Sequence, residues 1–241
     1  MNDETEASFI SHLIELRTRL LRCLFAFALL FIALSIYPGS SAIYDFLALP
    51  LTRALPEGTR MLAIGVVTPF MVPLKVTAMA AFALALPFVL YQIWAFVAPG
   101  LYLHEKRLVL PLIISSSLLF LLGMAFCYFL VFGQVFKFIA GFAPKSITPA
   151  PDIESYFSFV LTMFIAFGLS FEVPVALVML VKMGVVQLEK LRAWRSYFIV
   201  GAFVVAAVIT PPDVVSQLAL AIPMCLLYEL GMFAAWLTTR R

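Results

Sequence analysis

The sequence has 241 residues, of which 64% are hydrophobic and only 12% are charged, and its mean hydropathy is +1.08. Soluble domains are typically about 45 to 50% apolar and about 25% charged, so this composition excludes a soluble domain and, equally, a disordered chain. The formal net charge of +3, without a long basic run, excludes a nucleic-acid-binding protein. We therefore expect an integral membrane protein in contact with the lipid bilayer.

The apolar segments are continuous rather than alternating, which indicates membrane-spanning helices and not the strands of a barrel. We expect a single all-α polytopic membrane domain over residues 1–241. Its six helices cover about residues 20–37, 76–98, 108–132, 156–181, 197–209 and 214–236. The thirteen residues of the fifth helix rise only about 20 Å, whereas hydrocarbon is about 30 Å thick. We expect the fifth and sixth helices to be short and the bilayer to be thin beside them.

The basic residues are distributed unequally between the two sides that these helices define. Eleven Lys and Arg residues lie on the side that holds both termini and five on the other, which accounts for all 16. By the positive-inside rule, both termini are cytoplasmic. The two larger external connections, 38–69 and 142–152, are then loops.

The N-terminal segment Ser8–Arg22 has the pattern of an amphipathic helix, with apolar residues at helical spacing opposite a polar stripe. The polar stripe consists of His12, Glu15, Arg19 and Arg22. One interpretation is a helix on the membrane surface in which Glu15 and Arg19 form an ordinary ion pair one turn apart. The other is that Glu15 is a fixed carboxylate that binds a cationic partner from the cytoplasm.

A second cytoplasmic carboxylate, Glu105, lies in the short connection between the second and third predicted helices. Near a helix start it would complement the helix dipole, and Lys106 and Arg107 would be topogenic charges. Alternatively, Glu15 and Glu105 act together, because two guanidinium groups in a ligand would each seek a planar carboxylate.

Two carboxylates lie within predicted helices. Glu172 is near the middle of the fourth helix, where an ionisable group is costly and usually functional. Pro174 follows and would free a backbone carbonyl, which could open a polar notch there. The alternative is a neutral Glu172 bonded to a neighbouring helix. Glu229 is closer to the cytoplasmic end of the last helix, which favours snorkelling or an interfacial partner.

The remaining motifs indicate structure rather than catalysis. In the turn Thr210–Asp213, two prolines end one helix and Asp213 can cap the next. The cysteines Cys23, Cys127 and Cys225 are too far apart in sequence for a redox pair or a metal cluster. Because common catalytic motifs are absent, we expect no enzyme activity, no metal and no cofactor.

Four segments closely resemble the TatC family, the multi-spanning core of the Sec-independent twin-arginine protein translocase. They are His12–Leu20, Trp94–Tyr102, Phe171–Val175 and Thr210–Asp213. The resemblance implies a receptor for the twin-arginine signal peptides of folded cargo, located in the bacterial cytoplasmic (inner) membrane. It also implies a multimeric complex with single-helix partners of the TatA and TatB types, driven by the proton-motive force.

The resemblance also assigns roles to individual positions. It implies a signal-peptide site composed of Glu15, Arg17, Phe96, Tyr102 and Glu105. It further implies that Glu172 faces a membrane cavity and a partner helix, and that Pro50 and Asp213 matter on the external side.

Two other functions stay open from the residues alone. A proton-coupled small-molecule transporter would use Glu172 as its proton site. In a scaffold for single-helix partners, the four carboxylates discussed above would serve only packing or membrane topology. Only the receptor predicts that Glu15→Lys and Glu105→Lys weaken the binding of an Arg-Arg peptide.

Overall fold

The structure, a computed structural model, describes residues 3–53, 61–97, 106–142, 150–210 and 213–239. In chain order the elements are α1 (Asp3–Leu34), η1 (Ser35–Gly39), α2 (Ser40–Thr52), α3 (Thr68–Val97), α4 (Lys106–Phe126), η3 (Cys127–Val131), α5 (Phe132–Phe142), α6 (Ile153–Lys182), α7 (Leu188–Ala193), α8 (Arg195–Ile209) and α9 (Val214–Thr239). All of these elements are helical. Within the described ranges, the extended backbone forms one isolated β-bridge, between Leu62 and Asp152. The all-α prediction is confirmed for this part of the chain.

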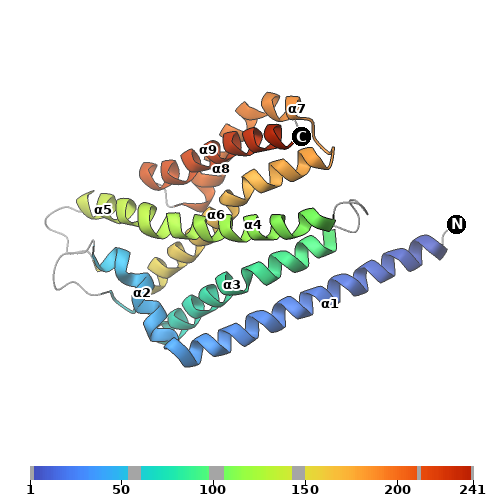
Figure 1. The fold of residues 1–241 in the computed structure, drawn as a ribbon. Coiled ribbons are helices and arrows are strands. Elements are labelled where there is room, and N and C mark those ends of the chain that lie inside the picture. The colour runs from blue at the N-terminus through green and yellow to red at the C-terminus, as the bar shows by residue number, and fades with distance from the viewer. Residues whose placement is uncertain (1–2, 54–60, 98–105, 143–149, 211–212, 240–241) are drawn as a thin grey trace.

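The long helices run alternately from one end of the molecule to the other. Figure 1 shows α1, α3, the joined α4 and α5, α6, α8 and α9 reversing direction in turn, so that both termini lie at the same end. Five helical stretches of the described chain are long and apolar enough to cross a membrane, and α8 is a shorter apolar helix. The grouping of the whole chain into one domain stays a prediction.

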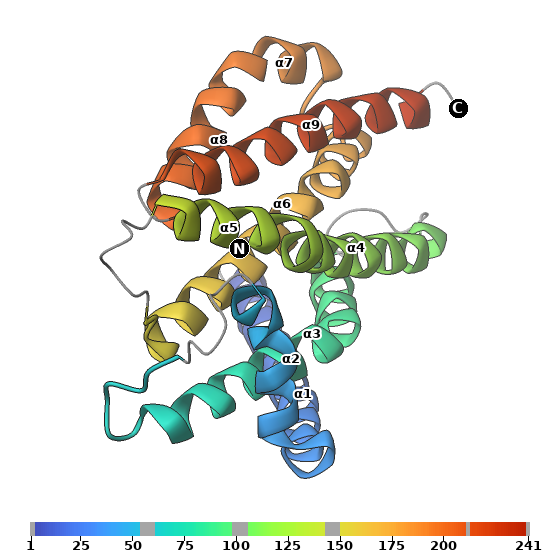
Figure 2. The same cartoon turned by 90° about the vertical axis from the view of Figure 1, so that its left-hand side faces the viewer.

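Two expectations about the helices are wrong. The sixth helix is not short, since α9 has 26 residues and α8 alone, with 15, is short. The external connection 38–69 is not only a loop, because it contains α2. Gly39, with φ of +93°, begins this helix after a sharp break, and the buried residues Leu47 and Leu51 attach α2 to the core. α2 and α5 both lie at the end that faces the viewer in Figure 2.

The N-terminal amphipathic segment and the first crossing form one continuous helix, α1, of 32 residues. The apolar stripe of this segment does not enter the core: Leu13, Leu16 and Leu20 are about half exposed or more. The polar stripe instead turns toward α3, because Arg19 contacts Gln92. In a soluble protein the apolar face of a helix points to the core and the polar face to water, whereas here the polar face points inward. Such an arrangement is typical of a helix whose outer neighbour is lipid or another apolar helix.

The core is centred on α6, which packs against α4 and α9. Small residues allow close approach on both sides. A Cβ added to Gly123 of α4 would lie 2.6 Å from the Phe167 carbonyl oxygen, and one added to Gly231 of α9 would lie 2.8 Å from Pro174 Cα. α6 remains helical through Pro174. The expected notch at this proline is therefore not an open gap, since α9 packs directly over it.

Candidate functional site

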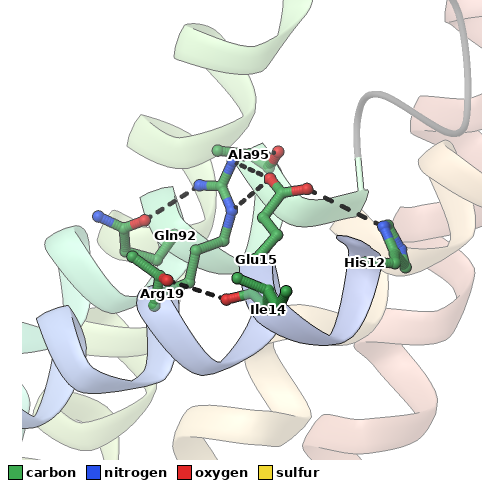
Figure 3. A network of polar contacts seen from close by, with 7 residues as sticks. His12, Ile14, Glu15, Arg19, Gln92 and Ala95 are labelled. Atoms are coloured by element: carbon green, nitrogen blue, oxygen red, sulfur yellow. Dashed lines mark hydrogen bonds and ion pairs between the residues drawn. The ribbon is translucent and has the colours of Figure 1, made fainter. Parts of the chain in front are cut away.

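A polar network joins α1 to the last turns of α3 at the end of the molecule that holds the termini. Glu15 and Arg19 lie one turn apart on the face of α1 that contacts α3. Gln92 and Ala95 come from the last turns of α3. Figure 3 shows the Arg19 side chain between them, with its guanidinium directed at acceptors on both helices.

Each nitrogen of the Arg19 guanidinium donates at least one hydrogen bond. Nε and Nη2 donate to the same Glu15 oxygen, Oε1, at 2.9 and 2.6 Å. Nη1 donates to Gln92 Oε1 at 3.0 Å, and Nη2 also donates to the Ala95 carbonyl oxygen at 3.1 Å. A carboxylate, an amide oxygen and a backbone carbonyl thus form a cradle that matches the planar fork of a guanidinium.

The second oxygen of Glu15 is left for other partners. Glu15 Oε2 lies 3.9 Å from His12 Nδ1, and the Glu15 side chain is 38% exposed. The His12 ring stacks on Phe96, with 4.5 Å between ring centroids and an interplanar angle of 24°. An accessible carboxylate edge beside an aromatic surface can accept a guanidinium and stack against its plane.

The structure brings together some of the residues predicted for this site. Phe96 lies near Glu15, because the His12 ring stacks on Phe96 and its Nδ1 lies 3.9 Å from Glu15 Oε2. Arg17 is exposed on α1 and does not join the network. Tyr102 and Glu105 lie outside the described residues, so their part in the site stays a prediction.

Sequence reasoning missed Gln92 as a site residue and treated Arg19 only as the ion-pair partner of Glu15. Gln92 is 4% exposed, so its amide must find a partner within the protein. The signal was present in the sequence, since an amide side chain near the end of an otherwise apolar helix needs such a partner. What could not be read from the sequence was that the partner lies 73 residues away, on α1.

Glu172 lies at the interface between α6 and α4 and is partly buried. The Ser116 hydroxyl of α4 is close enough to interact with it electrostatically, but the pair does not have direct hydrogen-bond geometry. Within the described residues, neither Glu172 Oε1 nor Ser116 Oγ has a hydrogen-bond partner. A buried carboxyl oxygen without a partner is costly inside a membrane, so the unpaired Glu172 and Ser116 oxygens mark a polar position within the contact between α4 and α6.

Glu229 differs from Glu172 because it has a partner within the chain. Arg195 of α8 contacts it through Nε to Oε1 at 2.6 Å and through Nη2 to Oε2 at 2.7 Å. Both side chains are about half exposed. This bidentate pair connects the start of α8 to the C-terminal half of α9. That the pair lies at the membrane interface stays a prediction.

The two residues that are predicted to lie on the external side, Pro50 and Asp213, have different surroundings. The Asp213 carboxylate caps α9 by accepting a hydrogen bond from the Ser216 backbone N–H at 2.7 Å. Asp152 caps α6 in the same way, and the hydrogen bonds that it accepts from Ser155 lower the pKa of its carboxyl group. Pro50 lies inside α2 and lines a cavity that this helix forms with α5.

Comparisons with known proteins bear on this arrangement. Residues 11–223 match the family described as Sec-independent protein translocase protein (TatC). The chain is 51% identical to the TatC protein of Escherichia coli strain K12 over 97% of its own length and 90% of that protein. It is also 51% identical to the TatC protein of Halothiobacillus neapolitanus, of which it spans 62%. A crystal structure of the twin-arginine translocase receptor TatC superposes with a TM-score of 0.82 at 40% identity, covering 95% of this chain and 99% of that one.

Proposed function

The chain belongs to the TatC family of Sec-independent protein translocase proteins, and on this premise we propose that it is a receptor for twin-arginine signal peptides and the core of a translocase. In this role it exports folded proteins, using the proton-motive force. It is a multi-pass membrane protein of the bacterial cytoplasmic membrane and acts in transport rather than as an enzyme.

The observation that carries the receptor proposal is the pair of unequal oxygens on Glu15. Oε1 is held by Arg19, while Oε2 lies 3.9 Å from His12 Nδ1 on a side chain that is 38% exposed. An incoming guanidinium can take Oε2 without displacing Arg19, because a carboxylate has about four acceptor positions. Glu105 supplies the second carboxylate in this proposal, on the strength of the family resemblance, with Arg17 and Tyr102 beside it.

The orientation follows from charge. With six crossings and both termini on one side, the positive-inside rule places the Glu15 network in the cytoplasm, where a signal peptide arrives. Figure 1 is consistent with this topology, since the two termini lie at one end of the molecule. α8, at 15 residues, rises about 22 Å, so thinning of the bilayer is confined to its side of the molecule.

The partners in the proposed complex are single-helix membrane proteins of the TatA and TatB types. Glu172 supports a contact with such a helix, because it is an ionisable group within a membrane helix and its side chain is only partly buried. Glu229 is less suited to contact a partner helix, because its carboxylate already forms an ion pair with Arg195.

Cross-linking tests this function against a proton-coupled transporter and a scaffold. A photoreactive group at Phe96 is expected to capture a peptide that carries an Arg-Arg pair more efficiently than the same peptide with Lys-Lys. A lysine ammonium is a point charge and does not reproduce bidentate geometry. Equal capture of the two peptides would contradict the receptor function, because neither alternative predicts discrimination between them.

A further inference from the structure

A half-open cavity of about 450 Å³ lies between α2 and the helix formed by η3 and α5, at the end of the molecule opposite the termini. Its walls combine two cations with aromatic and small residues. The lining residues that matter below are Pro50, Arg53, Tyr128, Phe129, Gly133 and Lys137. None of them belongs to the Glu15 network, which lies at the other end.

The two cations of this cavity come from different segments of the chain, and neither is paired with an acidic residue in the part of the chain that the structure describes. Arg53 follows the last residue of α2, and Lys137 is in the middle of α5. Both are exposed, and within the described residues neither forms an ion pair. Among the described residues, none of those that line the cavity is acidic. Two convergent positive charges in a concave site attract an anion.

The wall between these cations is a fixed aromatic surface. The Tyr128 hydroxyl donates a hydrogen bond to the Phe46 carbonyl oxygen at 2.6 Å, and the two rings are stacked with 5.1 Å between centroids. Beside them, Phe129 is 72% exposed and Leu130 is 51% exposed. The cavity therefore opens onto an apolar rim, which a small hydrophilic anion would leave uncovered.

The depth of these residues matches the boundary between hydrocarbon and headgroups. If Leu110 marks one edge of the hydrocarbon, Tyr128 lies about 27 Å further along the helix and Lys137 about 40 Å. The hydrocarbon is about 30 Å thick, and the headgroups extend the total to about 40 to 45 Å. Tyr128 is thus near the far edge of the hydrocarbon, as expected for an aromatic anchor. The backbone of Lys137 lies just beyond the far headgroup layer, which ends about 35 to 38 Å from the same starting edge, and its long side chain can reach back to the phosphates.

We propose that this cavity binds an anionic phospholipid. Arg53 and Lys137 contact the headgroup phosphate, and the acyl chains lie along Phe129 and Leu130. The guanidinium provides bidentate hydrogen bonds and the ammonium a point charge, which is the usual combination for phosphate oxygens. Basic pockets between membrane helices bind lipid headgroups in this manner. This proposal does not depend on signal-peptide binding.

The test measures lipid retention on the purified full-length protein in detergent. Native mass spectrometry with equal amounts of phosphatidylglycerol and phosphatidylcholine is expected to show preferential retention of phosphatidylglycerol. In the double variant Arg53→Gln, Lys137→Gln, the preference should fall about fivefold for each charge removed. The matched double variant Lys182→Gln, Lys190→Gln removes two exposed charges elsewhere and should keep most of the preference. An unchanged preference in the first double variant would overturn the proposal.

A variant that changes only the shape of the cavity distinguishes lipid binding inside the cavity from a general attraction of lipid to surface charge. A Cβ added to Gly133 meets open space and Gly133 lines the cavity, so the side chain of Gly133→Leu occupies part of the cavity and should reduce lipid retention with both cations intact. Gly141→Leu, also in α5 and also facing open space, is the control and should retain the lipid. Equal retention by the two leucine variants would contradict the site. Full displacement of the lipid by glycerol phosphate would show that the ligand is a free phosphate compound and would overturn the assignment to a phospholipid.

Discussion

Glu15 and Glu172 are both carboxylates on long apolar helices, yet the protein holds them in opposite ways. Glu15 receives two hydrogen bonds from Arg19, which is itself fixed by Gln92 and Ala95. Glu172 has a buried oxygen with no partner in the described chain. The first carboxylate is positioned by polar contacts and keeps one accessible edge. The second is positioned by the packing of α4 against α6.

The difference indicates two modes of recognition. A prepaired, partly exposed carboxylate binds a cationic ligand at little cost in reorganisation, because its orientation is already fixed. An unpaired, partly buried carboxyl group gains most from a partner that supplies a hydrogen bond inside the membrane. The two regions should therefore respond differently to substitution.

The largest expected effect is on peptide affinity at Glu15. Glu15→Lys removes the carboxylate and places a second cation next to Arg19, so the Kd of an Arg-Arg peptide should rise roughly 30- to 150-fold, or about 2 to 3 kcal/mol. Fluorescence anisotropy of a labelled peptide on the purified protein measures this change. Glu15→Gln keeps the size of the side chain and should weaken binding less. Unchanged affinity in both variants would remove Glu15 from the site.

Arg19 should affect stability more than its neighbour Arg17. Arg19→Ala leaves the buried Gln92 amide oxygen without its partner, which should lower the free energy of unfolding by about 1 to 3 kcal/mol. Arg17→Ala removes an exposed charge outside the network and should change stability by no more than about 0.5 kcal/mol. Denaturation in detergent compares the two. Equal stabilities would mean that the network contributes nothing to the α1 and α3 contact.

The close contact between α4 and α6 positions Glu172, and we expect a single added methyl group in this contact to lower the stability of the protein. In Gly123→Ala the new Cβ would lie 2.6 Å from the Phe167 carbonyl oxygen, so α4 and α6 must separate. Overpacking of this kind typically costs about 1 to 3 kcal/mol. Gly133→Ala meets open space and serves as the control. If both variants melt at the same temperature, close packing does not hold the two helices together.

The smallest stability effect is expected at Glu172 itself. Glu172→Leu removes an oxygen that has no partner, so the melting temperature should stay the same or rise. The Kd of the Arg-Arg peptide should change by less than about twofold, because the site lies at a different helix pair. Cross-linking of α6 to a single-helix partner should decrease. A clear loss of stability would instead reveal a partner for Glu172 within the chain.

The order of the helices could be predicted from the sequence because long apolar runs report directly on membrane crossings. α2 was missed since its thirteen residues are too few to span hydrocarbon, and its helix depends on contacts with α3. The predicted bounds of the last helix, 214–236, are close to those of α9, and the error was to describe a helix of this length as short. Glu15 was found from its place in a polar stripe, whereas Gln92 could not be assigned to the site, because pairing across two helices depends on their packing.

The central claim to test is that the signal peptide binds, through an arginine, to the second carboxylate oxygen of Glu15. The most direct measurement is the ratio of the Kd values for Lys-Lys and Arg-Arg versions of one peptide, in the wild type and in Glu15→Gln. The wild type should prefer the Arg-Arg peptide by about tenfold or more, and the preference should shrink in Glu15→Gln, because the charge-assisted hydrogen bonds of the peptide guanidinium to Glu15 Oε2 are lost. A ratio that is the same in both proteins would contradict the assignment of Glu15 as the residue that recognises arginine.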